Sequence, residues 1–235
     1  MATPSSRETT AAFASLAQLV YAGNGPDDVL GAICRAAVEI MPGADHACIS
    51  TLHGNQQLVT RAATDDVARQ MDQLESAAHE GPCLDSIVED SVQHDPDIRG
   101  NSKWPRLAEL TLSRTAVRGM VGYQLLDGLS GRAALNVFSD TPGALTNESV
   151  DVGVVLAAFT SVALAAAERQ LDAENLRRGL ESNREIGKAM GLLMAAHKVS
   201  DDEAFQILRS ASSRTNVKLA VLADRITSSH RDNLA

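Results

Sequence analysis

Apolar residues recur three and four positions apart through the last quarter of the chain, and this spacing restricts the fold more than any other feature. Three successive segments between Ser182 and Ile226 carry it. Residues at that spacing share one face of an α-helix, so the sequence predicts three amphipathic helices. A unit of about fifty residues buries only a marginal core by itself. We therefore expect these helices to pack on a partner copy or on the helix that precedes them.

Polar residues define the expected ends of these helices. Ser200 and Glu203 have the spacing of a capping box, in which each side chain satisfies a backbone donor at the start of the second helix. Asn216 stands just before the third helix and is expected to cap its start.

These three segments resemble the ANTAR domain, the RNA-binding output module of bacterial transcription antiterminators. The resemblance covers Arg184, Ile186, Ala189, Gly191, Leu193, Met194, Ala204, Phe205, Leu208, Arg209, Ser212, Asn216, Lys218, Leu219 and Ala223. It implies an all-α, three-helix, RNA-binding domain over residues 182–235. The family usually has Lys between the Ala and the Gly of its first helix, where this chain has Met190. If that Lys contacts phosphate in the family, one contact is lost here unless Lys188 replaces it.

The resemblance makes seven polar residues of the tail candidates for RNA contact. They are Arg184, Lys188, Arg209, Ser212, Arg214, Asn216 and Lys218, of which Lys188 and Arg214 are included only for their proximity. Arg matches phosphate through a bidentate fork, and Ser and Asn bond phosphate or unpaired bases. Without the resemblance, the same residues are typical of solvent-exposed helix faces. The one aromatic residue of the tail, Phe205, is expected in the core, so recognition should depend on the shape and phosphates of stem-loops.

Charge and cysteine content restrict the class of protein. The net charge is −9, but from residue 181 onward eight Lys and Arg face seven Asp and Glu, which permits RNA binding without predicting it. Three cysteines without a CxxC pair fit a reducing cytosol. The start of the chain lacks the pattern of a signal peptide, and the longest apolar run, 152–167, is shorter than the ~20 residues of a membrane span. We expect a soluble cytoplasmic protein without membrane contact.

Helix and strand patterns alternate before the tail. Helices are predicted at 9–22, 26–41, 67–77, 83–89 and after Trp104, strands at 45–52, 57–63, 91–93, 117–126 and 133–138, and a turn at 53–55. The helix period then returns near Thr146 and continues to Ala196. This order predicts an α+β fold, with helices on one face of an antiparallel sheet and a long helix leading to the tail.

The first part of the chain resembles the GAF domain, a small-ligand sensor of bacterial signalling, over residues 9–167. The resemblance rests on Glu80-Gly81-Pro82-Cys83, Trp104-Pro105, Tyr123-Gln124-Leu125 and the segment 131–138. Because these residues are markers of the fold, the sensor ligand and any cofactor stay unknown.

A heptad pattern runs along the predicted long helix. Apolar or small residues alternate three and four apart from Val152 to Met190, with Arg169 and Asn183 as polar exceptions that would fix the register. The pattern predicts a parallel coiled coil in a homodimer, with 168–181 as the connector between domains. The alternative is that its first half packs on the sensor sheet, and we expect both.

Cys83 is the candidate redox site, because a thiol in the first turn of a helix is expected to have a lowered pKa. A small buried hydrophobic residue is the alternative interpretation of this cysteine. No four ligands have zinc spacing, so no metal site is predicted, and without a phosphate loop or nucleophile elbow no enzyme is predicted either.

Together these patterns predict a signal-responsive regulator that binds stem-loops in nascent leader transcripts and prevents transcription termination. The alternative is a redox- or ligand-sensing protein-interaction module whose tail serves only dimerisation.

Overall fold

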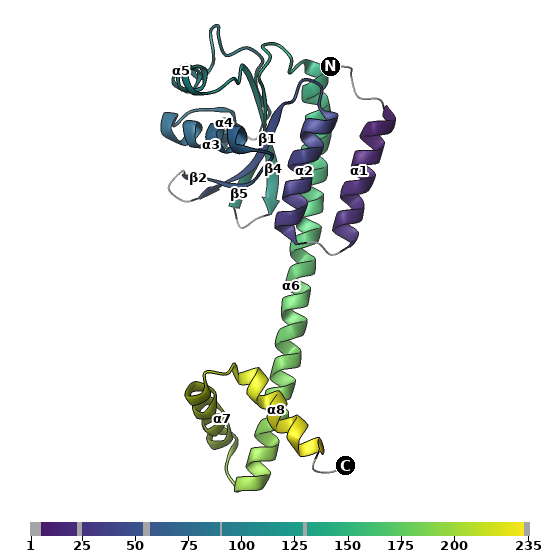
Figure 1. The fold of residues 1–235 in the computed structure, drawn as a ribbon, viewed down its shortest axis with the longest axis vertical. Helices are drawn as coiled ribbons and strands as arrows, with labels where there is room; N and C mark the ends of the chain where they lie inside the picture. The colour runs from purple at the N-terminus through teal and green to yellow at the C-terminus, as the bar shows by residue number, and fades with distance from the viewer. Residues whose placement is uncertain (1–5, 23–24, 54–56, 90, 129–130, 233–235) are drawn as a thin grey trace. The chain divides into compact units, whose positions relative to one another are not determined.

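The computed structural model describes residues 6–22, 25–53, 57–89, 91–128 and 131–232, and it divides into two compact units, Met1–Gln170 and Leu171–Ala235. The first unit contains α1 (Ser6–Tyr21), α2 (Pro26–Ile40), β1 (His46–His53), β2 (Gln57–Ala63), α3 (Asp66–Ala78), α4 (Pro82–Glu89), β3 (Gln93–Asp95), α5 (Pro105–Arg114), β4 (Gly119–Gly128) and β5 (Gly131–Ser139). Then follow α6 (Asn147–His197), which belongs partly to each unit, α7 (Asp201–Thr215) and α8 (Leu219–Asp232). The fold is α+β, as the sequence predicts (Figure 1).

Five antiparallel strands form the sheet of the first unit in the order β2-β1-β5-β4-β3. The predicted β4–β5 pair is present, with Tyr123 opposite Leu135. The short strand β3 lies two residues later than expected, and most of the predicted turn at 53–55 falls outside the described residues. The central position of β1 and β5 explains why both are almost entirely buried.

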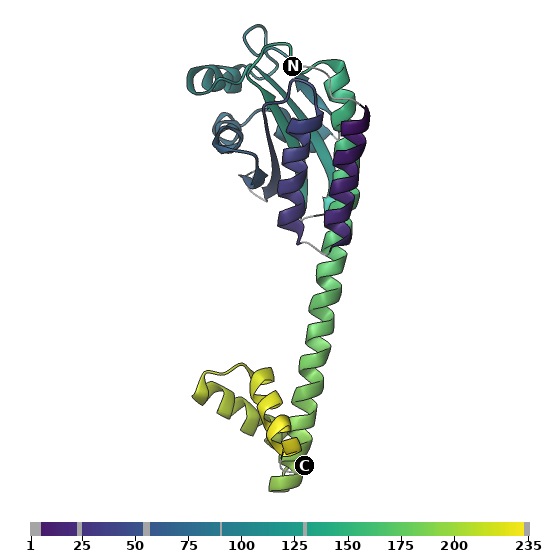
Figure 2. The same cartoon turned by 45° about the vertical axis from the view of Figure 1, so that its right-hand side comes forward.

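Helices cover both faces of the sheet, so the prediction of helices on one face is wrong (Figures 1 and 2). Ile49 and Leu135 pack with residues of α1, α2 and α6, whereas Met120 and Phe138 pack with residues of α3 and α5. Successive side chains of a strand point to opposite faces of the sheet, so apolar residues on these strands lie on both faces. A sheet that is apolar on both faces needs two covering layers, and the strands of this chain lack the alternation of a half-exposed sheet.

The segment Glu80-Gly81-Pro82-Cys83 is used to join three elements. The Glu80 carboxylate accepts hydrogen bonds from the amides of Arg106 and Leu107, at 2.6 and 3.1 Å, and so caps α5. Gly81 has φ of 154° and lies so close to Glu75 that a Cβ would stand 2.4 Å from its carboxylate. Pro82 then begins α4, as predicted, where its missing N–H is not needed.

Close backbone packing holds α4 on the sheet. A Cβ on Gly122 of β4 would lie 2.6 Å from the carbonyl oxygen of Pro82, well inside the contact distance. Any side chain at this position would therefore push α4 away from β4. Glu75 adds a second attachment, because its carboxylate accepts the Leu84 amide at 2.9 Å.

His46 ties the end of the sheet to two carboxylates. Its Nδ1 lies 2.8 Å from Asp65 Oδ2, and its Nε2 lies 3.4 Å from Asp140 Oδ1. Burial alone would lower the pKa of His46, but the hydrogen bond with Asp65 and the two negative charges raise it above its ordinary value. Asp65, which also caps α3 through the Ala68 amide, has a lowered pKa despite partial burial because His46 and Ala68 bond to it.

The long helix α6 is the one described helix that is long and apolar enough to cross a membrane, and 44 % of its apolar stretch is buried inside the protein. Leu156, Thr160 and Leu164 form the buried face in the first unit, where Phe159 also meets Phe13 of α1 edge to face at 5.3 Å. Burial against a sheet therefore accounts for the apolar composition, and membrane spanning is not evident. The half of the heptad prediction that placed α6 on the sensor sheet is confirmed.

The second unit is a three-helix fold with a small core. Ala189 of α6, Ala204 and Leu208 of α7 and Ala223 of α8 have no exposed surface. Half-buried aliphatic residues surround them, namely Ile186, Leu193, Leu219, Leu222 and Ile226. Small side chains at the centre let the three helices approach closely.

The predicted capping box of α7 is present, since Ser200 accepts from the Glu203 amide and Glu203 accepts from the Ser200 amide. Asn216 does not cap the start of α8 as expected. It adopts a left-handed conformation, with φ of 52°, and ends α7 by donating its N–H to the carbonyls of Ser212 and Ser213. Asn tolerates that conformation better than most residues, which explains the choice.

Candidate nucleic-acid interface and sensor interior

Two of the seven candidate RNA-binding residues lie on α6. Arg184 and Lys188 are one helical turn apart and exposed. Lys188 Nζ lies 2.6 Å from Glu185 Oε1, so part of its charge is already neutralised within the helix. Arg184 forms no ion pair within the described part of the second unit, and its guanidinium is available to a phosphate. Arg184 is thus the stronger of the two candidates on this helix.

The remaining candidates lie on α7 and in the turn that follows it. Arg209, Arg214 and Lys218 are exposed, whereas Ser212 is half-buried. The spacing of Arg209 and Ser212 places these two on one face of α7, with Arg214 on another side, and Asn216 follows the end of the helix. Ser212 Oγ donates to the carbonyl oxygen of Val217 at 2.6 Å. Ser212 is therefore less available to a ligand than the cations beside it, whereas Asn216 shapes the turn through its backbone and keeps an exposed side chain.

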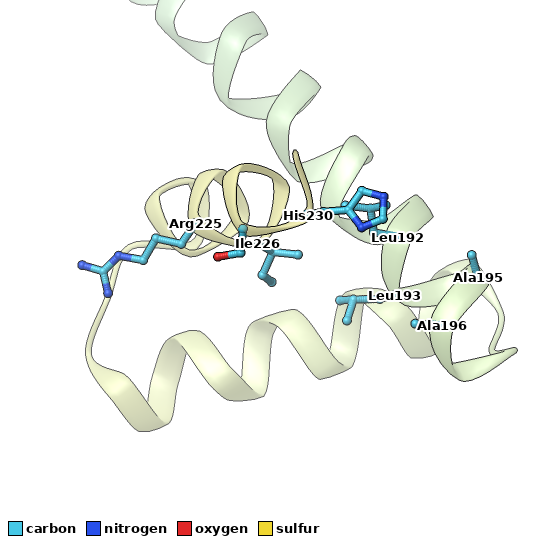
Figure 3. A pocket seen from close by; sticks show the side chains of 8 residues that line it. Leu192, Leu193, Ala195, Ala196, Arg225, Ile226 and His230 are labelled. Atoms are coloured by element: carbon cyan, nitrogen blue, oxygen red, sulfur yellow. The ribbon is translucent and has the colours of Figure 1, made fainter. Parts of the chain in front are cut away.

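Two adjoining hollows between α6 and α8, here called the α6–α8 hollow, were not anticipated from the sequence. The larger has a volume of about 740 Å³ and the smaller about 380 Å³, and Leu192 and His230 line both (Figure 3). Arg225 lines the larger one and extends outward from it. The helix period of α8 indicates which of its residues face α6, but it does not indicate that the space beside them is open.

A network of buried polar groups lies between the sheet and α3. The carboxylate of Asp72 accepts hydrogen bonds from the hydroxyls of Ser50 and Thr60 and from the thiol of Cys48. Asp72 is only 3 % exposed, and burial raises its pKa although these three donors oppose the effect. On the neighbouring strand the side-chain oxygen of buried Asn136 has no hydrogen-bond partner among the described residues. The polar groups of this interior are therefore compatible with a structural role, because Cys48, Ser50 and Thr60 already donate to the Asp72 carboxylate.

Cys83 lies in the same interior and does not have the pKa expected for a reactive thiol. It is fully buried, and burial together with the charges of Glu75 and Asp72 raises its pKa well above the ordinary value. Burial thus outweighs the effect of the helix N-terminus on which the redox hypothesis depends. In the described residues no group of three His, Cys, Asp or Glu side chains is arranged to hold a metal ion.

Comparison with protein-family models gives two matches that together span most of the chain. A model described as a GAF domain matches residues 23–165, and one described as an ANTAR domain matches residues 174–226. A search among curated proteins finds no match.

Solved structures similar to this chain share the architecture of the first unit. Free methionine-R-sulfoxide reductase from Neisseria meningitidis, solved with its substrate, has a TM-score of 0.53 at 10% identity and covers 72% of this chain and 95% of its own. The phycoerythrobilin-bound GAF domain of a cyanobacterial phytochrome has 0.52 at 10%, covering 69% and 96%. The GAF domain of an Acinetobacter phosphoenolpyruvate-protein phosphotransferase has 0.51 at 15%, covering 71% and 97%. At these identities the likeness concerns the fold alone.

Proposed function

The chain belongs to the GAF family through residues 23–165 and carries an ANTAR domain at residues 174–226, and from this pairing we propose that it is a signal-responsive antiterminator that binds RNA stem-loops. A GAF domain with an ANTAR domain makes a sensing and regulatory protein. In the proposed activity the ANTAR domain captures stem-loops of a nascent leader transcript, so that a terminator hairpin cannot form. A small molecule bound by the sensor is the proposed input.

One observation supports RNA binding above the others. The matched ANTAR residues include four exposed cations, Arg184, Arg209, Arg214 and Lys218, that form no ion pair within the described part of the unit. Cations that are not neutralised by the protein can displace the counterions of phosphates, which is the main source of affinity for nucleic acids. The net charge of the tail is nearly zero because Asp201, Asp202 and Glu203 offset these cations, but the three acidic residues are confined to the first turn of α7.

A parallel dimer through α6 belongs to the same proposal. Val155, Val162, Leu176 and Leu180 occupy seam positions of the predicted heptads and are 58–69 % exposed. Four exposed aliphatic side chains along one helix are unusual for a surface that stays in water, and a second copy of the same face would cover them. Input at the sensor would then change the pairing or register of the two helices, and RNA would stabilise the arrangement that binds it better.

The proposal is tested by binding of the purified full-length protein to paired stem-loop RNAs and to scrambled stems at several salt concentrations. Tight binding of the stem-loops with a steep log–log salt dependence is expected, because each neutralised phosphate contributes a slope of roughly 0.7–0.9. Arg209→Ala should weaken binding and reduce that slope by about one. Arg114→Ala, which removes an exposed arginine from the sensor domain, is the matched control and should change neither.

Weak and equal binding of all RNAs, with or without cell metabolites, would sink the proposal. It would favour the second candidate, a protein-interaction module whose tail serves dimerisation. That candidate is supported by Met190 in place of the usual Lys and by the pairing of Lys188 with Glu185. Sedimentation analysis tests the dimer that both candidates require: Leu176→Ser should produce monomers, whereas Leu171→Ser, which changes a less exposed residue off the seam, should not.

A further inference from the structure

The α6–α8 hollow has the size of a small-ligand site, and small residues on α6 leave its space unfilled. Its larger part, at about 740 Å³, lies within the roughly 300–1,000 Å³ typical of such sites. Ala195, Ala196 and Gly191 on α6 contribute little or no side chain to its walls. A Cβ placed on Gly191 would meet nothing within 4 Å, so the space beside α6 at this point is empty. Small residues on one helix therefore leave room that a larger side chain would fill.

The floor and the rim of the hollow differ in chemistry. Aliphatic side chains, including Leu192, Leu193 and Ile226, form the floor. From α8 the exposed imidazole of His230 lines the hollow, and Arg225 lies at its border with the guanidinium directed outward (Figure 3). The polar groups of the smaller part are already paired, since Glu185 Oε2 accepts from the Thr227 hydroxyl at 3.2 Å and Glu185 Oε1 bonds Lys188. A ligand in the hollow thus meets an apolar surface bordered by planar and cationic groups.

We infer that the hollow receives one unpaired base from the loop of the bound RNA, with the base stacked on His230 over Leu192. This inference rests on the proposed function and names a subsite within it. Splayed loop bases bind proteins by stacking on aromatic rings, including imidazole, and on Arg planes. Phe205, expected in the core, is only half-buried and lies outside the core cluster, and it does not line the hollow. His230 is therefore the ring that the hollow offers for stacking. Arg225, which also lines the larger part, would meet a phosphate next to the base.

A helix of a partner protein fits the hollow less well than a base. Amphipathic helices bind grooves through anchors at i, i+3, i+4 and i+7, and the hollow as a whole, which runs along α6 from Glu185 to Ala196, is long enough for one. Chemistry favours the base, because the exposed imidazole of His230 offers a flat face for stacking and Arg225 lies beside it for a phosphate.

The test is a double-mutant cycle between protein and RNA. The probe is a hairpin with a fixed stem and a randomised loop, from which the tightest binder to the full-length protein is selected. Each loop base of that hairpin is then removed singly as an abasic nucleotide. We expect one abasic position to weaken binding about tenfold or more, as loss of a stacked base does. His230→Ala should weaken the intact hairpin by a similar factor, and the combination should cost less than about twofold beyond either change alone.

Three further variants separate stacking from charge and from folding. His230→Phe should keep the affinity, because the flat ring remains. Gly191→Leu should weaken binding by filling the space, whereas Gly179→Leu should not, since Gly179 is an equally open glycine of α6 outside the hollow. Because His230 is exposed, its variants should not change thermal unfolding. The two glycine variants should both raise the unfolding temperature slightly, since Leu favours a helix more than Gly does, so a loss of binding confined to Gly191→Leu cannot come from unfolding.

The outcomes separate the inference from the function on which it rests. Additive losses in the cycle, or full affinity of His230→Ala, would overturn the base site while RNA binding itself stood. Absence of any stem-loop binding by the unmodified protein would overturn both. Retained affinity of Gly191→Leu would likewise exclude the hollow as the place of the base.

Discussion

Replacing Leu208 by Ala should strongly destabilise the ANTAR domain and leave the stability of the sensor domain unchanged. Leu208 is the largest side chain without exposed surface in the second unit, and the other fully buried apolar residues there are alanines. Truncating a buried Leu to Ala costs about 2–5 kcal/mol, through lost apolar burial and the cavity that remains. The alanines around Leu208 have no freedom to fill that cavity, so we expect a value in the upper half of the range.

The expected cost is comparable to the whole stability of the unit. Native domains are stable by roughly 0.05–0.15 kcal/mol per residue, which corresponds to about 3–9 kcal/mol for a unit of some sixty residues. Loss of about 4 kcal/mol would unfold a domain at the lower end of this range and would remove about half of the stability of one at the upper end. The first unit does not contain Leu208, and its free energy of unfolding should not change.

Differential scanning calorimetry of the full-length protein, with hydrogen exchange to assign each transition, measures both quantities. Ile207→Ala is the matched control, because Ile207 is the neighbouring residue and is 39 % exposed. Its cost should stay below about 1 kcal/mol. If Leu208→Ala shifts the ANTAR transition no more than Ile207→Ala does, or moves the sensor transition equally, this account of the core is refuted.

Three predictions concern the sensor domain. Glu75→Gln should cost less than about 1 kcal/mol, because the side-chain amide keeps an acceptor for the Leu84 N–H. Glu75→Ala should cost about 2–4 kcal/mol, because it leaves that buried N–H unpaired. Urea unfolding measures both costs, and equal costs would show that the hydrogen bond to Leu84 does not stabilise the domain. Gly122→Ala should lower sensor stability by about 1–3 kcal/mol, because its Cβ would lie 2.6 Å from the backbone of Pro82; an unchanged Tm would show that α4 moves freely. The raised pKa of His46 stabilises the fold fully below the unfolded value near pH 6.5, and this contribution is lost as pH rises through the folded pKa. The lowered pKa of Asp65 gives a contribution to stability that is present above about pH 4 and is lost as the pH falls through the folded pKa. The ion pair of His46 and Asp65 should therefore stabilise the fold most between about pH 4 and pH 6.5. His46→Gln should flatten the fall in Tm above pH 6.5, and an unaltered pH profile would contradict the assignment.

Local sequence patterns anticipated the elements but not their surroundings. The helix period predicts α6 to within a residue at each end, because it reflects which positions face a core, but α8 begins later than expected and continues six residues beyond Ile226. The capping box at Ser200 is equally local, and it is present. Asn216 failed as a prediction because the same residue type suits both the start of one helix and the left-handed end of another. Asn216 ends α7 here because α8 begins only at Leu219, so Asn216 directly follows the last residue of α7 and lies three residues before α8.

The functional groups were harder to predict because their chemistry depends on burial. Cys83 has the sequence environment of a helix start, yet its pKa is set by the layer that encloses it. Nothing in the order of residues indicates that the layer is closed. His230 shows the reverse case, because an ordinary surface residue becomes a candidate site only when Gly191 and two alanines leave the opposite wall open.

The alanines at the centre of the ANTAR domain give it an asymmetric mutational tolerance. Shrinking Ala189, Ala204 or Ala223 to Gly removes one methyl group and costs about 1 kcal/mol, chiefly through helix propensity. Enlarging any of them forces two helix backbones apart, and no side-chain rearrangement nearby relieves the clash. Substitutions at these positions therefore damage the domain mainly by what they add, whether volume or a buried polar group. A mutational scan should therefore show that Ala189, Ala204 and Ala223 tolerate Gly but no larger side chain.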